Sequence, residues 1–301
     1  MKVDYRYVMG CLAGVACGLS TLAHGQTVFD VPLMRRADHE TQQGFVRVAS
    51  LGTGYIDIDA WDDAGTHAFT DLYVEQGRTY HFNSTDLEDG NPTKGINAGI
   101  NEGEGDWYLQ LSADFDFVVT SYIRTEDGFV TAMGNTLVPV DGSAFGAECA
   151  FEASFFNPAS NTKQVSSLRI VEYDDVETEV RILGYDDDGD VYGPVDLTVP
   201  ASGTRTVTAQ QLEAGGDGIR DSLGDGFGKW RLVVLTDGSI VVLNLLETPT
   251  GHLTNLGPMV SPSIIGDGEG HGAVEVATGC PGAPDQNLVA RGRGGVAGVS
   301  P

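Results

Sequence analysis

The sequence has little of several things, and each shortage argues against a class of protein. Basic residues are scarce: 17 Lys and Arg stand against 43 Asp and Glu, for a net charge of -26. Nucleic acid and anionic lipid surfaces would repel such a chain. The four cysteines form no Cys-x-x-Cys pair and no Cys/His cluster of the zinc-binding kind. Beyond the N-terminus, no apolar run approaches the roughly 20 residues that a membrane helix needs.

Catalytic motifs are missing as well. No serine lies in a Gly-x-Ser-x-Gly elbow, and Gly142-Ser143-Ala144-Phe145-Gly146 has its serine at the wrong position. Five histidines follow the first 25 residues without any shared ligand spacing: His39, His67, His81, His252 and His271. Acidic residues are too numerous to single out a glycosidase pair. These shortages argue against an enzyme.

The first 25 residues are typical of a secretory signal peptide. Basic residues precede an apolar stretch over 8–22, and Ala23-His24-Gly25 fits a small-x-small cleavage site. We expect an extracytoplasmic protein, whether periplasmic, at the cell surface or secreted, with no membrane span after signal removal. Two alternatives stay open: lipidation at Cys17, although 14–16 is a poor lipid-attachment box, and an anchor that is never cut.

Signal removal would leave two cysteines, Cys149 and Cys280. In an oxidising compartment such a pair is more often a disulfide than a reactive site. We therefore expect a bridge between the start of the second repeat, described next, and the C-terminal tail.

An internal repeat organises the chain. Gly105-Asp106-Trp107-Tyr108-Leu109 recurs as Gly228-Lys229-Trp230-Arg231-Leu232, and the register holds downstream. Upstream it slips by only a residue or two, so that Val46-Arg47-Val48 pairs with Leu168-Arg169-Ile170. Likewise, the segment 61–65 pairs with 185–189. No histidine recurs between the copies. Two units follow, at 27–146 and 149–260, and a tail occupies 261–301.

Alternating apolar and polar residues between Gly, Asp and Asn turns predict short strands in each unit. The clearest segments are 46–51, 55–61, 68–74, 78–82, 107–111, 115–123 and 129–133, then 176–185, 230–235 and 239–246. Because a strand with one apolar face must bury it against a second sheet, we expect an all-β fold of two tandem β-sandwich-like repeats.

One short helical turn is predicted in each unit, at Asn83–Glu88 and at Thr208–Glu213. Each begins with a capping residue three positions before an Asp or a Gln, which satisfies the first free N–H groups of a helix. The tail beyond 260 is rich in Gly and Pro and lacks apolar periodicity, so it is expected to be flexible.

The acidic run Asp186-Asp187-Asp188-Gly189-Asp190 could ring a calcium ion. The EF-hand template fails, however, because the sixth and twelfth positions from Asp186 are Val191 and Leu197 where Gly and Glu are needed. A hairpin turn explains both this run and its counterpart at 62–65. The acidic surface as a whole keeps an exported protein soluble, and divalent cation binding is the alternative.

The loop before each tryptophan keeps its glycines, its apolar anchors and one acidic residue in both units. The retained positions are Gly95, Ile96, Ile100, Glu102, Gly103, Gly105 and Trp107, and then Gly218, Ile219, Leu223, Asp225, Gly226, Gly228 and Trp230. Glycines at fixed places indicate positive φ or close backbone approach. A folded loop pinned to the core explains this. The alternative is a shallow binding surface, or calcium held by Glu102 and Asp225 in their respective units.

Large aromatic residues recur at matched strand positions, Trp61 with Tyr185 and Trp107 with Trp230. Flat rings can form a carbohydrate platform, but an inward core residue is the commoner role at such positions.

Several motifs together resemble a bacterial extracellular repeat. They are 155–161 (FFNPASN), 164–170 (QVSSLRI), 184–187 (GYDD), Asp86-Leu87-Glu88, and the segment Tyr122 to Phe129. That repeat occurs in tandem in exported proteins, sometimes beside trypsin-like protease domains, and the similarity spans roughly 27–260. The family implies no assigned activity and no ligand residues. The first copy departs from the pattern at 34–38, where the Asn-Pro turn is missing, and no protease domain accompanies the repeats in this sequence.

The sequence therefore predicts a non-catalytic secreted or cell-surface protein that serves in interaction, in adhesion or as a spacer. The sequence does not identify the ligand; a glycan and a cell-surface protein are the candidate partners, and no cofactor is expected unless calcium binds. A carbohydrate-binding module is the first alternative. A hydrolase or hydrolase accessory domain is the second.

Overall fold

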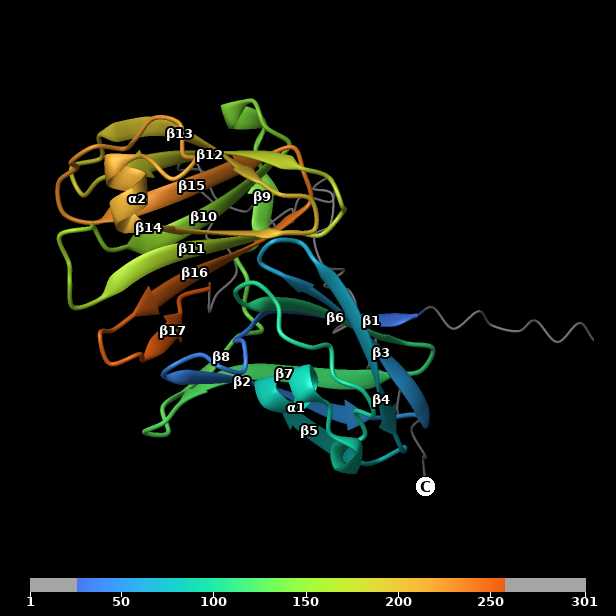
Figure 1. The fold of residues 1–301 in the computed structure, drawn as a ribbon. Helices are drawn as coiled ribbons and strands as arrows, with labels where there is room; N and C mark the ends of the chain where they lie inside the picture. Colours follow the sequence, from blue (N-terminus) through green and yellow to red (C-terminus); the bar gives the residue numbers. More distant parts are fainter. Residues whose placement is uncertain (1–25, 258–301) are drawn as a thin grey trace, which may run out of the picture.

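The protein folds into four antiparallel sheets, as Figure 1 shows for a computed structural model that describes residues 26–257. The elements of the first half are β1 (Thr27–Met34), β2 (Gln42–Ser50), β3 (Gly54–Asp62), β4 (His67–Val74), β5 (Thr79–Asn83), α1 (Ser84–Asp89), the 3-10 turn η1 (Pro92–Lys94), β6 (Trp107–Ala113), β7 (Phe117–Thr125) and β8 (Val130–Ala132). Those of the second half are β9 (Pro139–Asp141), η2 (Ser143–Phe145), β10 (Cys149–Phe156), β11 (Val165–Glu172), β12 (Thr178–Tyr185), β13 (Val191–Val199), β14 (Thr204–Thr208), α2 (Ala209–Ala214), β15 (Trp230–Thr236), β16 (Ile240–Glu247) and β17 (Leu253–Asn255).

Strand order is the same in the two halves. The first unit contains sheet I, ordered β1-β6-β3-β4, and sheet II, ordered β5-β2-β7-β8. The second contains sheet III, β13-β12-β15-β10-β9, and sheet IV, β14-β11-β16-β17. When each strand is replaced by its repeat counterpart, sheet I matches sheet III and sheet II matches sheet IV, with β9 as an addition. The predicted all-β, sandwich-like fold is confirmed.

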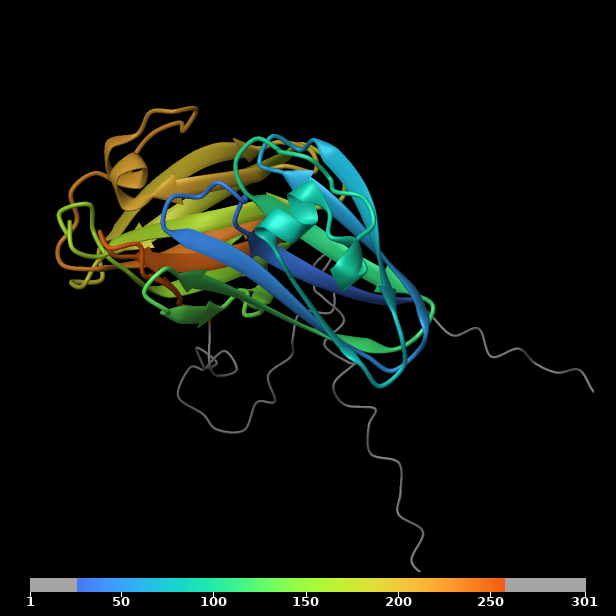
Figure 2. The same cartoon turned by 60° about the horizontal axis from the view of Figure 1, so that its bottom comes forward.

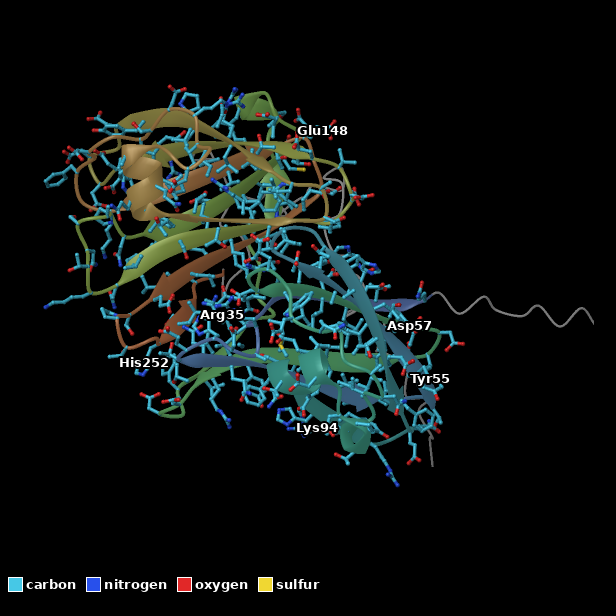
Figure 3. All side chains as sticks on the ribbon, in the orientation of Figure 1. Arg35, Tyr55, Asp57, Lys94, Glu148 and His252 are labelled. Atoms are coloured by element: carbon cyan, nitrogen blue, oxygen red, sulfur yellow. The ribbon has the colours of Figure 1, made fainter. Side chains whose placement is uncertain are left out.

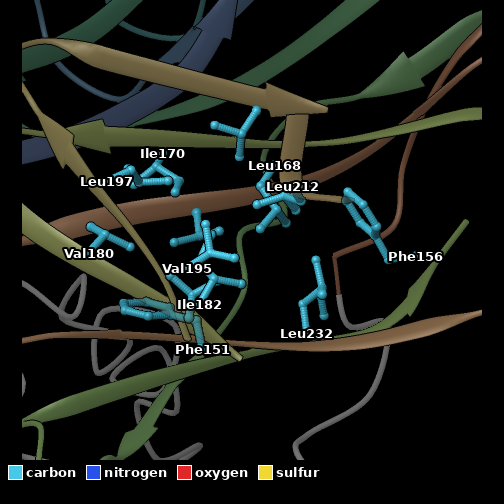
Figure 4. Packing of buried hydrophobic residues seen from close by; sticks show 14 of the residues in the cluster. Phe151, Phe156, Leu168, Ile170, Val180, Ile182, Val195, Leu197, Leu212 and Leu232 are labelled. Carbon is cyan, nitrogen blue, oxygen red and sulfur yellow. The ribbon is translucent and has the colours of Figure 1, made fainter. Parts of the chain in front are cut away.

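Strand alternation places an apolar core between the two sheets of each unit. In β3, Ile56, Ile58 and Ala60 are fully buried while the residues between them face outward. The second unit has a core of the same kind, in which Ile182 and Leu232 pack against Leu168 and Leu212 (Figure 4). Fully burying one such side chain stabilises the fold by about 1.5–3 kcal/mol.

Both predicted helical turns are present and are capped as expected. Asn83 accepts from the backbone N–H of Asp86, whose side chain accepts from the N–H of Asn83. Thr208 and Gln211 form the same reciprocal pair at the start of α2. Each box satisfies two N–H groups that a helix start leaves free.

The chain enters the second sandwich earlier than the repeat pattern indicated. Strand β9 pairs with β10, although Pro139–Asp141 lie within the predicted first unit of 27–146. Leu137 also donates its N–H to the carbonyl of Val242 in β16. Sequence comparison could not reveal this strand because it has no counterpart in the first unit.

The two units lie against each other through the outer face of sheet IV, a contact that Figures 1 and 2 show from two sides. Outward-facing side chains of β11, β16 and β17 meet apolar side chains of the first unit. One cluster joins Leu243, Leu245 and Leu253 to Leu33, Ile123 and Met133, and a second joins Val171, Val241 and Tyr173 to Trp61 and Tyr108.

A buried arginine lies in the same contact. Arg169 is 2% exposed, its Nε donates to the carbonyl of Pro32 at 3.1 Å, and its guanidinium lies 2.7 Å from a carboxylate oxygen of Asp63. Both partners belong to the first unit. Because removing Asp63 would leave the buried guanidinium without its carboxylate, this ion pair links the two units.

Three predictions fall at or beyond the edges of the described residues. The signal peptide (1–25) and the tail (261–301) lie outside them, as does Cys280 of the predicted bridge. Cys149 is disulfide-bonded. Within 26–257, no helix is long and apolar enough to cross a membrane.

Candidate binding surfaces

Two glutamates hold the repeated tryptophans in place. The indole N–H of Trp107 donates to Glu88 at 2.9 Å, and that of Trp230 donates to Glu213 at 2.8 Å. The same carboxylate oxygens accept backbone N–H groups, from Ala37 in the first unit and from Ala159 in the second. Desolvation raises the pKa of Glu88 despite these donors. This acidic pair escaped the sequence comparison, although both residues end the matched helical turns.

The aspartates of the Asp-rich turns hold backbone rather than a ligand. Asp62 accepts the N–H groups of Ala64, Thr66 and Glu104, and Asp186 accepts those of Asp188, Asp190 and Phe227. Each aspartate therefore ties its hairpin turn to the loop before the tryptophan. Such side-chain to backbone hydrogen bonds are typical of an Asp in a hairpin turn, the interpretation favoured for both segments from the sequence.

The loops before the tryptophans need glycine at several positions, because a side chain there would clash or the backbone has positive φ. A Cβ on Gly103 would lie 2.6 Å from the ring of Trp107, and one on Gly226 would lie 2.2 Å from Trp230. Gly95, Gly105, Gly218 and Gly228 all have positive φ. Ile96, Ile100, Ile219 and Leu223 are buried as anchors.

The proposed calcium ligands of these loops are not brought together with other ligands. Glu102 and Asp225 are both exposed. Within residues 26–257, no group of three or more His, Cys, Asp or Glu side chains could hold a metal ion.

The tryptophans do not form a platform. Trp107 is 2% exposed and Trp230 is 3% exposed, as expected for core residues. Trp61 is half-buried and packs into the contact between the units, with its ring 5.5 Å from that of Tyr108. Any aromatic surface must therefore come from other residues.

Such a surface lies on the outer side of sheet I, where β3 and β4 pair. We call it the acidic aromatic face and define it by six residues: Tyr55, Asp57, Asp59, Phe69, Asp71 and Tyr73. Tyr55 pairs directly with Tyr73, Asp57 with Asp71, and Asp59 with Phe69 across the two strands. Figure 3 labels Tyr55 and Asp57 on the side of the first unit away from the second unit. Sequence alternation in β3 gave a signal for it, because Tyr55, Asp57 and Asp59 interleave with the core residues.

The aromatic rings of this face are open to solvent. Tyr55 is 56% exposed, Phe69 54% and Tyr73 39%. The two tyrosine rings meet edge to face, with centroids 5.3 Å apart. Tyrosine rings combine an apolar body with a polar hydroxyl, so this face offers both apolar and hydrogen-bonding contacts.

No Lys or Arg of the described chain pairs with the three carboxylates of the face. Asp59 contacts His67 at 2.8 Å. Desolvation raises the pKa of Asp57, and the negative charges of Asp59 and Asp71 raise it further. A cation brought to this face would relieve that repulsion.

Sheet III closes the equivalent face with the protein's own cations. Arg181 takes the place of Asp57 and lies 2.9 Å from Asp196, the counterpart of Asp71. Farther along the same sheet, at positions that match Tyr108, Asp30 and Trp61 of the first unit, Arg231 pairs with Glu152, and its guanidinium carbon lies 4.3 Å from the ring centroid of Tyr185. The same sheet position is therefore neutralised internally in one unit and left acidic in the other.

Two cavities in the described chain are small. One, of about 190 Å³, lies beside Arg181 and Asp196 in the second unit. The other, of about 150 Å³, lies at the contact between the units and is lined by Arg35, Arg169 and Glu247 among others. Both are below the roughly 300 Å³ at which small-molecule sites usually begin.

No protein-family model and no curated protein matches the chain. Among solved structures, the Anabaena sensory rhodopsin transducer is similar over 31% of this chain and 89% of its own length, at 22% identity and a TM-score of 0.25. A likeness of that score does not bear on the function of this chain.

Proposed function

We propose that the protein is an exported, non-catalytic interaction protein, and that the acidic aromatic face of its first unit is the surface that binds a partner. The observation that carries the proposal is the contrast between sheets I and III. Arg181 neutralises Asp196 in the second unit, whereas no Lys or Arg among residues 26–257 pairs with Asp57 or Asp71 of the first.

The chemistry of the face favours a partner protein that presents Lys or Arg side chains. A guanidinium can pair with a carboxylate while it stacks on a neighbouring ring, as Arg231 does with Glu152 and Tyr185 in the second unit. A partner's arginine would meet the same combination at Asp57, Asp71 and Tyr73. Arg231 supports this choice of partner chemistry, because one guanidinium there contacts both a carboxylate and a ring.

A variant that closes the face tests the proposal. Asp57→Arg copies the arrangement of Arg181 and should pair with Asp71. Wild type is expected to bind an immobilised arginine-rich peptide, and Asp57→Arg is expected to lose that binding. Arg181→Asp, which makes the reverse change on the second unit, is the matched control and should retain it. Equal binding by wild type and Asp57→Arg, or no binding by wild type to peptide or glycan, would overturn the proposal.

A glycan is the second candidate, and the exposed Tyr55–Tyr73 pair favours it because flat rings stack on sugars. A glycan array separates the two, with salt as the discriminating variable. Binding through charge falls steeply as salt rises toward 0.5 M, since the Debye length shrinks to several ångströms. Binding by ring stacking changes little, and Tyr73→Ala would then cost more than Asp71→Asn.

A further inference from the structure

The contact between the two units uses a different surface from each, and the chain carries an unused copy of both. The first unit contributes a docking edge, defined by Leu33, Trp61, Asp63 and Gly65. The second contributes an acceptor face, the outer side of sheet IV, defined by Arg169, Val171, Val241, Leu243 and Leu245. Because the units are repeats, the second unit also has a docking edge, and the first unit also has an acceptor face.

The two ionic residues of the contact have counterparts at matched positions. Arg47 in β2 pairs across the sheet with His81 and Thr120, as Arg169 in β11 pairs with Thr206 and Leu243. Asp187 accepts the N–H of Lys229 at 2.9 Å, as Asp63 accepts that of Asp106 at 3.0 Å. Each copy therefore presents its charged group from the same backbone position.

Both counterparts are exposed. Arg47 and Asp187 lie at the surface, whereas Arg169 is 2% exposed. Within residues 26–257, Arg47 has no ion-pair partner and one carboxylate oxygen of Asp187 accepts no hydrogen bond. They carry opposite charges, and each unit contributes one of them.

Two pairs of matched glycines differ in the same way: a Cβ on one member of each pair would contact the other unit, and a Cβ on the second member would contact nothing. A Cβ on Gly65 would lie 2.6 Å from the carbonyl oxygen of Ala201 in the second unit, but one on Gly189 would meet nothing within 4 Å. A Cβ on Gly251 would lie 2.5 Å from Thr41 of the first unit, but one on Gly128 would meet nothing. The hairpin at Gly189 is therefore open in the docking edge of the second unit, although Arg231 lies over the ring of Tyr185, the counterpart of Trp61. In the first unit there is space at Gly128 itself, while Asp127 and Phe129 beside it contact His252 of the second unit.

We infer that copies of this chain associate head to tail, with the docking edge of the second unit in one copy seated on sheet II of the next. The contact is heterologous, since edge and face differ, so it adds copies in sequence instead of stopping at a symmetric dimer. Arg47 takes the role of Arg169, and Asp187 takes the role of Asp63. Val118, 51% exposed, lies where Val241 is buried.

Two differences make this contact weaker than the one inside the chain. Thr120 replaces Leu243 on the acceptor face, and Tyr122, whose hydroxyl is hydrogen-bonded to His81, replaces Leu245, so two aliphatic contacts of sheet IV are absent from sheet II. Lys229 also replaces Asp106. Burial raises the pKa of Asp106, but the positive charges of Arg35 and Arg169 lower it by more, so Asp106 carries a negative charge near Arg169. The association is therefore expected to depend on concentration, and Lys229→Asp should strengthen it.

Sedimentation velocity on the full chain over a concentration series tests the inference. The mean mass of wild type is expected to rise with concentration through dimers to larger species. Arg47→Asp and Asp187→Arg each place like charges in the contact and should raise its dissociation constant about thirtyfold or more. An equal mixture of these two variants restores opposite charges at every contact, and its mass should return toward that of wild type. Arg220→Asp, which makes the same charge change at an exposed site elsewhere, should behave as wild type.

Three results would overturn the inference. In the first, wild type and Lys229→Asp are both monomeric at every concentration. In the second, association is unchanged in Arg47→Asp and Asp187→Arg. In the third, the mixture of those variants fails to regain mass although each variant keeps the circular dichroism spectrum and melting temperature of wild type. Peptide binding by Asp57→Arg is a separate readout, so this inference and the proposed function can fail independently.

Discussion

Sheets II and IV have the same strand order and opposite surroundings. The outer face of sheet IV is apolar and lies against the first unit, whereas that of sheet II is exposed and bears Arg47, Thr120 and Arg124. The two sheets have the same strand order because the inward-facing positions keep apolar residues in both copies. The outward positions are free to diverge, since nothing in the sandwich core depends on them. The two copies therefore share the sandwich and differ in their outer faces.

The largest test of this contrast compares the matched arginines. Arg169→Ala removes a buried guanidinium from Asp63 and from the carbonyl of Pro32, and it should lower the free energy of unfolding by about 3–5 kcal/mol. Arg47→Ala changes an exposed position and should stay within about 0.5 kcal/mol. Urea denaturation at low protein concentration, where copies are separate, measures both. If both variants lost the same free energy of unfolding, burial of Arg169 at the contact would not stabilise the fold.

Glycines at one matched turn give a smaller test. Gly65 and Gly189 have φ of 85° and 84°, so alanine is strained at both, by about 1–2 kcal/mol. Only Gly65→Ala would also press a Cβ against the backbone of Ala201, which cannot rotate away as a side chain can. We expect Gly65→Ala to cost at least about 1 kcal/mol more than Gly189→Ala in the same denaturation assay. A larger loss for Gly189→Ala would contradict the arrangement of the units.

The repeat was predictable because both copies keep the same residues at matched positions, and the helical turns were predictable because their signals are local. Asn83 with Asp86, and Thr208 with Gln211, satisfy each other within four residues, and the sequence spacing alone reveals them. Strand β1 did not appear among the predicted strands because its alternation is broken. The register shifts between Val31 and Met34, so inward residues no longer recur at every second position.

The candidate site was only partly predictable, for a different reason. Alternation shows that Tyr55 and Asp57 face outward, but only the register of β3 on β4 brings Tyr73 and Asp71 beside them. Glu102 and Asp225 were proposed as ligands because both copies keep an acidic residue at that position, but they are exposed residues of packed loops. A site that distinguishes the two units cannot be found by asking what the units share. The informative positions are those where the copies differ in charge, such as Asp57 and Arg181.

The smallest test concerns a hydrogen-bonded aspartate and histidine at the contact between the units. His252 lies 2.6 Å from Asp127 and stacks on Phe129, whose ring centroid is 4.7 Å away. Hydrogen bonds from Thr125 and then from His252 lower the pKa of Asp127 to about 2. A carboxyl whose pKa is lower in the folded state stabilises the fold above its unfolded pKa, about 3.9, and loses that contribution as the pH falls through about 2.

Asp127→Asn removes the titrating group, so the difference in melting temperature between wild type and this variant should shrink between pH 5 and pH 2. Other carboxylates titrate in the same window, but they do so in both proteins and cancel in the difference. Glu126→Gln, at the adjacent exposed position, is the matched control and should show no such narrowing. A constant difference across the window would mean that His252 and Asp127 do not act as a pair. Stacking of His252 on Phe129 would then be the interaction that joins the two hairpins.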